Sequence, residues 1–168
     1  MAQTSPGASA ADIFLHLQTK RAGKVKGEAT AADHVDDIAV VGWHWGLSGS
    51  SVAGSTQAGA RRSYTALTVI KHIDQATTAL MSALATNDEV KEARLTMRRA
   101  GGSQDDYFIV KLQRGRITSV EHSTRDDGST QETVAIHFGK VDVEYRPQAA
   151  SGLRTGATTF SDELPQVG

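Results

Sequence analysis

The Gly-Trp-His-Trp-Gly segment at residues 42–46 most constrains the fold, because it holds both tryptophans of the chain two residues apart. Side chains in a β-strand alternate between two faces, so Trp43 and Trp45 share one face and His44 lies on the other. Stacking on a ligand is the alternative role for such a pair, but aromatic residues on one face of an apolar strand more often belong to a core. We therefore expect both tryptophans in a core. The opposite face is nearly bare, open to close approach by another molecule, and consists of Gly42, His44 and Gly46.

The composition excludes several classes of protein. The 168 residues fit one domain with a sizeable core, and 18 basic against 19 acidic residues lack the basic excess of a nucleic-acid or membrane-surface binder. Because there is no cysteine, disulfides, thiol nucleophiles and thiolate metal sites are excluded. No apolar run approaches the ~20 residues that span a bilayer, and residues 1–11 lack the features of a secretory signal peptide. We expect a soluble protein made in the cytoplasm, with no nucleic-acid partner and no membrane insertion, whose export needs a non-classical route.

Alternation of apolar and polar residues predicts β-strands through the middle of the chain. Prolines occur only at positions 6, 147 and 165, so every residue in 12–146 retains a backbone donor for a ladder. A parity change at Gly139-Lys140 predicts a β-bulge within one long strand, and residues 126–129 predict the turn before it. The predicted strands are 13–17, 38–47, 64–73, 93–97, 108–112, 117–120 and 134–145.

A single helix is predicted from Thr77, as its N-cap, to about Thr86. Its apolar stripe contains Leu80, Met81 and Leu84. Many strands with one helix favour a mainly β fold, either a barrel or a sandwich, with the helix covering one side. The core is expected to include Trp43, Trp45, Leu80, Leu84 and Phe138.

Residues 48–59 are small and polar apart from one valine, so we expect a projecting loop rather than a hairpin turn. Residues 1–10 predict a flexible tail, 11–147 the barrel domain and 148–168 a second tail, either disordered or docked on a neighbouring chain. The basic pair Arg61-Arg62 is either solvated surface or complementary to acidic patches of another subunit.

Catalytic and metal-binding patterns do not assemble in the sequence. His34, Asp36, Asp37 and His44 could suggest a metal site, but along a strand they are too far apart to bind one ion. Nucleophile-elbow and phosphate-loop motifs are absent from the sequence. We therefore predict no enzyme activity, no cofactor and no metal.

The ordered motifs resemble the haemolysin-coregulated protein (Hcp) family of type VI secretion systems from residue 11 to residue 147. The central match is Asp36-Asp-Ile-x-Val40 followed by Trp43-His-Trp45-Gly46, which is similar to the family's I-D-V-x-x-W-x-W-G. Their joint order and spacing carry the resemblance. The matching segments are 12–15, 26–28, 36–46, 71–77, 93–101, 107–112 and 138–145.

The resemblance implies a two-sheet β-barrel with one α-helix packed on the outside and an extended loop. Family members form hexameric rings that stack into the inner tube of a contractile injection machine, inside a sheath and behind a spike protein. The rings also carry and stabilise effector proteins in their lumen. The protein would be cytoplasmic before firing and secreted afterwards. Alternatives are a phage-like tail-tube protein and a small-molecule-binding barrel with a closed apolar pocket.

Residue roles also follow from the resemblance. The bare face of the Trp segment, with Gly42, His44 and Gly46, is expected to face the lumen and its cargo. The loop from residue 48 onward is similar to the family's extended loop, which contacts neighbouring subunits. The expected inter-subunit residues are Ser48, Gly49, Ser50, Gly54, Gly59, Arg61 and Arg62.

Overall fold

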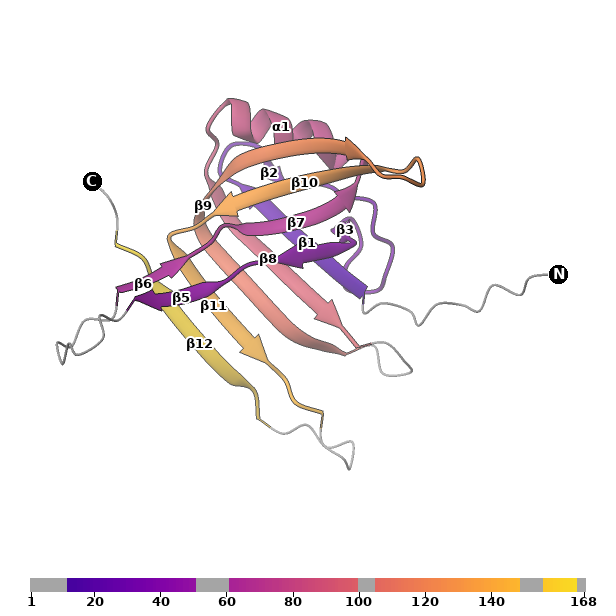
Figure 1. The fold of residues 1–168 in the computed structure, drawn as a ribbon. Coiled ribbons are helices and arrows are strands. Elements are labelled where there is room, and N and C mark those ends of the chain that lie inside the picture. Colours follow the sequence, from indigo (N-terminus) through magenta and orange to yellow (C-terminus); the bar gives the residue numbers. More distant parts are fainter. Residues whose placement is uncertain (1–11, 51–60, 100–104, 149–155, 166–168) are drawn as a thin grey trace.

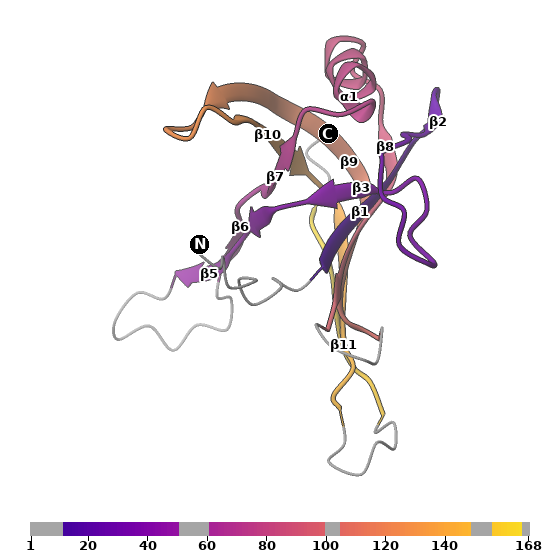
Figure 2. The same cartoon turned by 90° about the vertical axis from the view of Figure 1, so that its right-hand side faces the viewer.

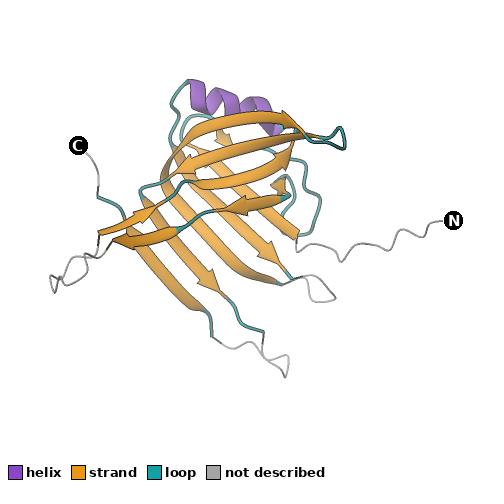
Figure 3. Ribbon diagram, viewed as in Figure 1, coloured by secondary structure: helices purple, strands orange, loops and turns teal. Residues whose placement is uncertain are grey.

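The computed structural model of the protein describes residues 12–50, 61–99, 105–148 and 156–165. Within these ranges the chain forms twelve strands and one helix (Figures 1 and 3). In chain order they are β1 (Asp12–Thr19), β2 (Gly23–Lys24), β3 (Ile38–Val40), β4 (Gly42–His44), β5 (Leu47–Ser50), β6 (Arg61–Tyr64), β7 (Leu67–His72), α1 (Ala76–Ala85), β8 (Val90–Arg98), β9 (Asp106–Thr124), β10 (Thr130–His137), β11 (Lys140–Tyr145) and β12 (Thr158–Glu163).

Two sheets share the long strand β9. The long sheet has the order β2-β1-β8-β9-β11-β12, with β3 also paired to β1, and the short sheet has the order β9-β10-β7-β4. The first half of β9 pairs with β8 and β11, and its second half pairs with β10. Between the halves, Arg114 has φ +52°, and a Cβ on Gly115 would lie 2.9 Å from the carbonyl oxygen of His137. Only glycine fits at this bend, where β9 leaves one sheet for the other.

The chain itself joins the two sheets on the side of the barrel opposite β9. β3 pairs with β1 of the long sheet and β4 pairs with β7 of the short sheet, and Val41 joins them while donating to the carbonyl of Ile70 at 2.8 Å. The single strand expected at residues 38–47 is therefore three strands, β3, β4 and β5, because each stretch has a different partner. The two-sheet β-barrel with one outer helix is confirmed (Figure 2).

The core is filled by alternate residues of both sheets. Trp43 and Trp45 are half-buried and pack against it, with the Trp43 ring 6.1 Å from that of Phe108 and the Trp45 ring 6.0 Å from that of Phe138. Val41 is half-exposed, so the tryptophan face ends at the kink between β3 and β4. Residues with no exposed surface include Leu15, Leu17, Leu67, Val69, Leu95, Val110, Leu112, Val134 and Ile136.

Helix α1 begins two residues earlier than predicted. Gln75 is the N-cap, Asp74 Oδ1 accepts from the Ala76 amide at 2.9 Å, and Thr77 lies inside the helix. Leu80 is buried, whereas Leu84, expected in the core, lies at the edge of the buried face and is 37 % exposed. The remaining buried helix residues are Ala76, Thr77 and Ala83.

A buried charged cluster fixes α1 to the short sheet. Lys71 of β7 and Glu132 of β10 are both fully buried, and the Lys71 ammonium lies 3.0 Å from Glu132 Oε1. Thr77 of α1 donates to Glu132 Oε2 at 2.7 Å, and Asp74 is a second partner of Lys71 at 2.9 Å. Lys71 and Glu132 share the inward face of their strands, so this cluster joins the short sheet at the edge of the core to α1, which packs on the outside of the barrel.

Three further expectations are corrected by the strand pairing. The parity change at Gly139 separates two strands in different sheets, rather than bulging one long strand, and Gly139 donates to the carbonyls of Gln113 and Arg114 at the β9 bend. Residues 158–163, expected in a tail, form β12 along β11. Residues 48–50, expected in a loop, belong to β5, which pairs with β6 as a separate two-stranded ribbon. The predicted turn at 126–129 is confirmed, with Gly128 at φ +86°.

Candidate lumen and assembly surfaces

The outward face of the short sheet contains the His44 side of the Trp segment. His44 is exposed and lies opposite Thr68 on β7, and Gly42 lies opposite Ile70. A Cβ added to Gly42 would lie 3.6 Å from Ile70 Cδ1. Because glycine has no side chain, the surface beside Ile70 is shallow. The ladders continue this face into β10 and β9 with small and polar side chains. Along the two rows these are Ala135 and Ser119, then Thr133 and Glu121.

This face has few side chains that could bind a partner tightly. Besides Ile70, the residues of these rows are glycine, alanine, serine, threonine, histidine or glutamate. Gly46 lies beyond β4, where its amide donates to Thr65 Oγ1 at 2.8 Å, so it does not continue the ladder. Gly42 and His44 therefore share the expected surface, and Gly46 marks where the chain leaves it for the ribbon.

The β5–β6 ribbon projects from the barrel beside one end of β12 (Figure 1). Ser48, Gly49 and Ser50 are exposed on β5 and pair with Ser63, Arg62 and Arg61 of β6. Gly54 and Gly59 lie outside the described residues. A two-stranded ribbon with both faces exposed has little stability of its own in water, so its position depends on contacts at its base.

Asp162 of β12 provides the main contact at the ribbon's base. Arg62 donates to Asp162 Oδ1 at 2.9 Å and to the carbonyl of Glu163 at 3.0 Å, and the Tyr64 hydroxyl donates to Asp162 Oδ2 at 2.8 Å. Burial, together with the hydrogen bond to Asp162, raises the pKa of Tyr64 to about 12. The Tyr64 ring also stacks on Trp45, with centroids 5.7 Å apart. The predicted inter-subunit residue Arg62 is thus part of an internal tether.

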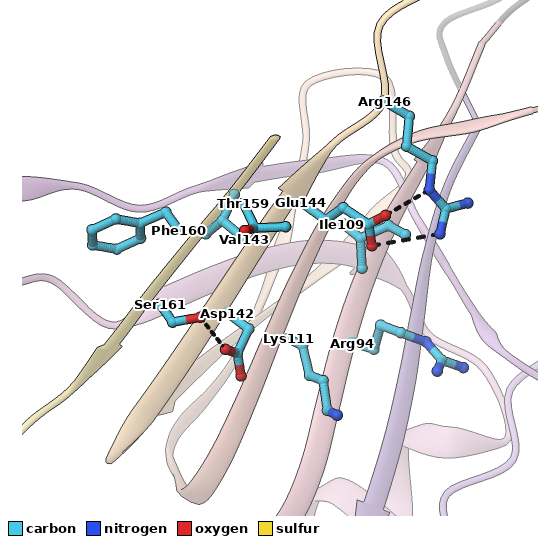
Figure 4. A pocket seen from close by; sticks show the side chains of 10 residues that line it. All are labelled: Arg94, Ile109, Lys111, Asp142, Val143, Glu144, Arg146, Thr159, Phe160 and Ser161. Carbon is cyan, nitrogen blue, oxygen red and sulfur yellow. Dashed lines mark hydrogen bonds and ion pairs between the residues drawn. The ribbon is translucent and has the colours of Figure 1, made fainter. Parts of the chain in front are cut away.

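The outward face of the long sheet carries a charged depression that the sequence reasoning missed (Figure 4). Alternation places Leu95, Val110 and Leu112 toward the core and directs Arg94 and Lys111 outward. The sequence has charged residues at alternate positions of several strands, but only the strand register places them side by side. Its lining residues are Arg94, Ile109, Lys111, Asp142, Val143, Glu144, Arg146, Thr159, Phe160 and Ser161.

The segment between β2 and β3 covers another part of this outward face. His34 is buried, its ring stacks on Phe14 at 4.3 Å, and its two nitrogens lie 3.0 Å from Asp37 and 3.2 Å from Asp106. Burial alone would raise the pKa of Asp37, but hydrogen bonds from His34 and Lys24 lower it below its ordinary value. His44 lies on the short sheet, away from this cluster, and the described residues contain no group of three candidate ligands placed to hold a metal.

The described residues thus form an open two-sheet barrel with one helix, two unlike outward faces and a tethered ribbon. The family model for "Type VI secretion system effector, Hcp" matches residues 14–145. The chain therefore belongs to the Hcp family of type VI secretion proteins. In the described part of the chain, the helix is neither long nor apolar enough to cross a membrane.

Individual relatives agree with this assignment. Protein hcp1 of Pseudomonas aeruginosa is 35% identical over 153 residues, which cover 88% of this chain and 90% of that protein. A solved type six secretion system protein is 27% identical, with a TM-score of 0.80 over 92% of this chain and 96% of that one. Hcp1 from Salmonella typhimurium is 25% identical, with a TM-score of 0.71 over 92% and 95% of the two chains.

Proposed function

We propose that the protein is the tube subunit of a type VI secretion system, forming hexameric rings that stack into the inner tube. The observation that carries this proposal is the Hcp family match, which spans residues 14–145 and both sheets of the barrel. A ring needs two different complementary surfaces on each subunit, and stacking needs another pair. The exposed ribbon and the two unlike sheet faces offer such surfaces. The tube would lie within a contractile sheath and behind a spike protein.

The outward face of the short sheet is the proposed lumen wall. A channel that releases its cargo on delivery needs a surface with few strong anchors, and the rows around Gly42 and His44 consist mainly of small and polar side chains. Effector proteins would contact this surface inside the ring and be shielded there from solvent and proteases. The protein would act in the cytoplasm as carrier before firing and would be secreted with the tube.

The ribbon is the proposed contact to neighbouring subunits. Its exposed residues Ser48, Gly49, Ser50 and Arg61 have no cover from the described part of their own chain. Small side chains favour close backbone contact, and Arg61 adds a positive charge. Arg62 contributes by fixing the direction in which the ribbon leaves the barrel.

Electron microscopy of the purified protein tests the ring. Negatively stained particles should show rings with a central hole, and native mass spectrometry of the same sample should give a mass six times that of the 17.8 kDa chain. A sample that stays strictly monomeric at tens of micromolar would refute the proposal.

Cargo binding tests the lumen wall separately. His44→Asp places a carboxylate on the proposed wall in every subunit, and charges that must desolvate against cargo weaken its binding. We expect rings of normal mass that retain about fivefold less co-purified effector, a change of about 1 kcal/mol. Thr78→Asp, at an exposed position of α1 away from this face, controls for an added charge alone. An unchanged amount of bound effector in intact rings would show that His44 does not line the lumen.

The small-molecule-binding alternative is not favoured. Such a barrel needs an enclosed apolar pocket, whereas the depression on the long sheet is open at the surface and half of its lining residues are charged. The match to a secretion family likewise favours a secretion tube over a phage-like tail tube.

A further inference from the structure

The depression on the long sheet has a cationic half without an adequate counter-ion. Arg94 of β8 and Lys111 of β9 are directly opposite in the ladder, and like charges placed opposite each other destabilise a sheet. In the described part of the chain, Lys111 has no carboxylate within ion-pair distance. Arg94 has only Glu92, at 3.6 Å and partly exposed. A carboxylate from another molecule between Arg94 and Lys111 would relieve this repulsion.

The carboxylates inside the depression already have partners on its other side. Asp142 accepts a hydrogen bond from Ser161, and Glu144 pairs with Arg146 at 2.9 Å (Figure 4). The bond from Ser161 holds Asp142, which lies opposite Lys111 in the ladder, on the β12 side, and Arg146 pairs with Glu144, whose side chain extends across the sheet. The cationic half therefore remains available to an external acid.

The turn between β9 and β10 presents such an acid on a rigid support. Asp127 is used within the turn, where it accepts from the Ser129 amide at 2.9 Å and from its hydroxyl at 2.6 Å. The amides of Arg125 and Gly128 close the turn at 2.8 and 2.9 Å. Asp126 is exposed, and within the described residues it makes no ion pair or side-chain hydrogen bond. A carboxylate held on an ordered turn loses little conformational entropy when it binds.

The two surfaces lie on opposite sides of the subunit. Figure 2 shows the β9–β10 turn on one side and the long sheet edge-on at the other, with its outward face turned away from the turn. The turn therefore cannot reach the depression of its own chain. Head-to-tail contacts between two unlike surfaces are the kind that close a ring.

We propose that the β9–β10 turn of one subunit docks on the outward face of the next subunit's long sheet, with Asp126 between Arg94 and Lys111. The contact is heterologous, and its partner is a second copy of this chain within the same ring. This inference rests on the proposed ring-forming function and adds the surfaces that would join its subunits.

A charge exchange tests the contact. Lys111→Glu and Asp126→Lys should each raise the protein concentration at half-assembly by at least about tenfold, the lower end of coupling measured for close charge pairs across interfaces. The double variant restores opposite charges and should return assembly toward the wild-type value. Lys91→Glu on β8 and Glu28→Lys make the same charge changes at exposed positions outside both surfaces, and should assemble normally. Sedimentation velocity at several concentrations gives the measurement.

The outcomes separate this contact from the proposed function. Wild-type rings with both single variants still fully assembled would overturn the contact and leave the ring intact as a proposal. Impaired single variants without recovery in the double variant would also overturn it, as would defects confined to ring stacking. Monomeric wild-type protein would instead contradict the proposed function itself. Loss of wild-type rings on raising salt from 0.05 to about 0.5 M, where charges are more strongly screened, would add support.

Discussion

The outward face of the short sheet and that of the long sheet belong to one barrel wall, yet their chemistry differs. The first carries small and polar side chains around Gly42 and His44, whereas the second carries long charged ones at the Arg94–Lys111 depression. Strand β9 contributes to both, with Lys111 on one face and Ser119 on the other. The difference separates a surface suited to transient contact from one suited to a specific partner. Mutations can test whether the two faces depend on the shared core and whether their roles are separate.

The largest effect should come from the buried ion pair that fixes α1 to the short sheet. Glu132→Ala leaves Lys71 buried with Asp74 as its remaining acidic partner, and unpairing a buried charge typically costs about 3–5 kcal/mol. We expect a loss of about 4 kcal/mol in the free energy of unfolding, measured by urea titration. The paired variant Lys71→Met with Glu132→Leu removes both charges and should lose less. Equal losses in the two proteins would contradict the argument.

The next effect compares neighbouring residues of β4. Trp43 packs against Phe108 on the core side, so Trp43→Ala should cost about 3 kcal/mol, the lower end for removal of a large aromatic side chain because Trp43 is half-buried. His44 is exposed on the opposite face, and His44→Ala should change stability by less than about 0.5 kcal/mol. Thermal and urea unfolding of both proteins give the values. Similar costs at the two positions would show that β4 does not separate core from surface.

Lowering the pH should also reduce the free energy of unfolding, by less than Glu132→Ala or Trp43→Ala does. Burial alone would raise the pKa of Glu132, but hydrogen bonds from Thr77, Lys71 and His122 and the Lys71 charge lower it below its ordinary 4.5. A carboxyl group with a lowered pKa stabilises the fold above its unfolded pKa, and this contribution is lost as pH falls through the folded pKa. The free energy of unfolding should hold above about pH 5.5 and fall below about pH 4.5.

The variant Glu132→Gln provides the control for this pH dependence. It keeps the shape of the side chain but removes its titration, so its stability should fall less steeply over the same acidic range. Urea midpoints measured in half-unit steps of pH check both slopes. Identical slopes in the two proteins would assign the acid sensitivity to other groups.

The smallest effect concerns the ribbon tether. Arg62→Ala removes the ion pair to Asp162, which is screened by solvent, so the free energy of unfolding should fall only slightly. Hydrogen exchange of the β5 and β6 amides should accelerate while that of the core strands stays constant. The matched variant Arg61→Ala, at an exposed neighbouring position on β6, should leave exchange unchanged. Equal acceleration of exchange in both variants would show that the contact between Arg62 and Asp162 does not hold the ribbon in place.

The sequence carried enough information to predict the barrel, because alternation marks a strand whose two faces meet different surroundings. Trp43 and Phe138 lie at or in the core for this reason, and Leu80 is buried through the apolar stripe of the helix. Leu84 is exposed because the buried face of α1 is centred on Ala76, Leu80 and Ala83, and Leu84 lies at its edge. Apolar composition alone does not distinguish the centre of a helix face from its edge.

What the sequence left undetermined depends on pairing between distant strands. Strand β12 has a small-residue composition and is ordered along β11, a partner that no local pattern specifies. The depression on the long sheet requires the register that brings Arg94, Lys111 and Asp142 into one row. Local alternation shows that each points outward but does not show that they are neighbours.

Site-specific labelling of assembled rings tests the central claim, that the face with His44 lines the lumen. The chain has no cysteine, so His44→Cys provides one thiol for a maleimide-linked gold particle. Met81→Cys, on the exposed side of α1 across the core from this face, is the control. Electron micrographs should show gold in the central hole for position 44 and outside the hole for position 81. Gold from position 44 on the outer rim of intact rings would contradict the account.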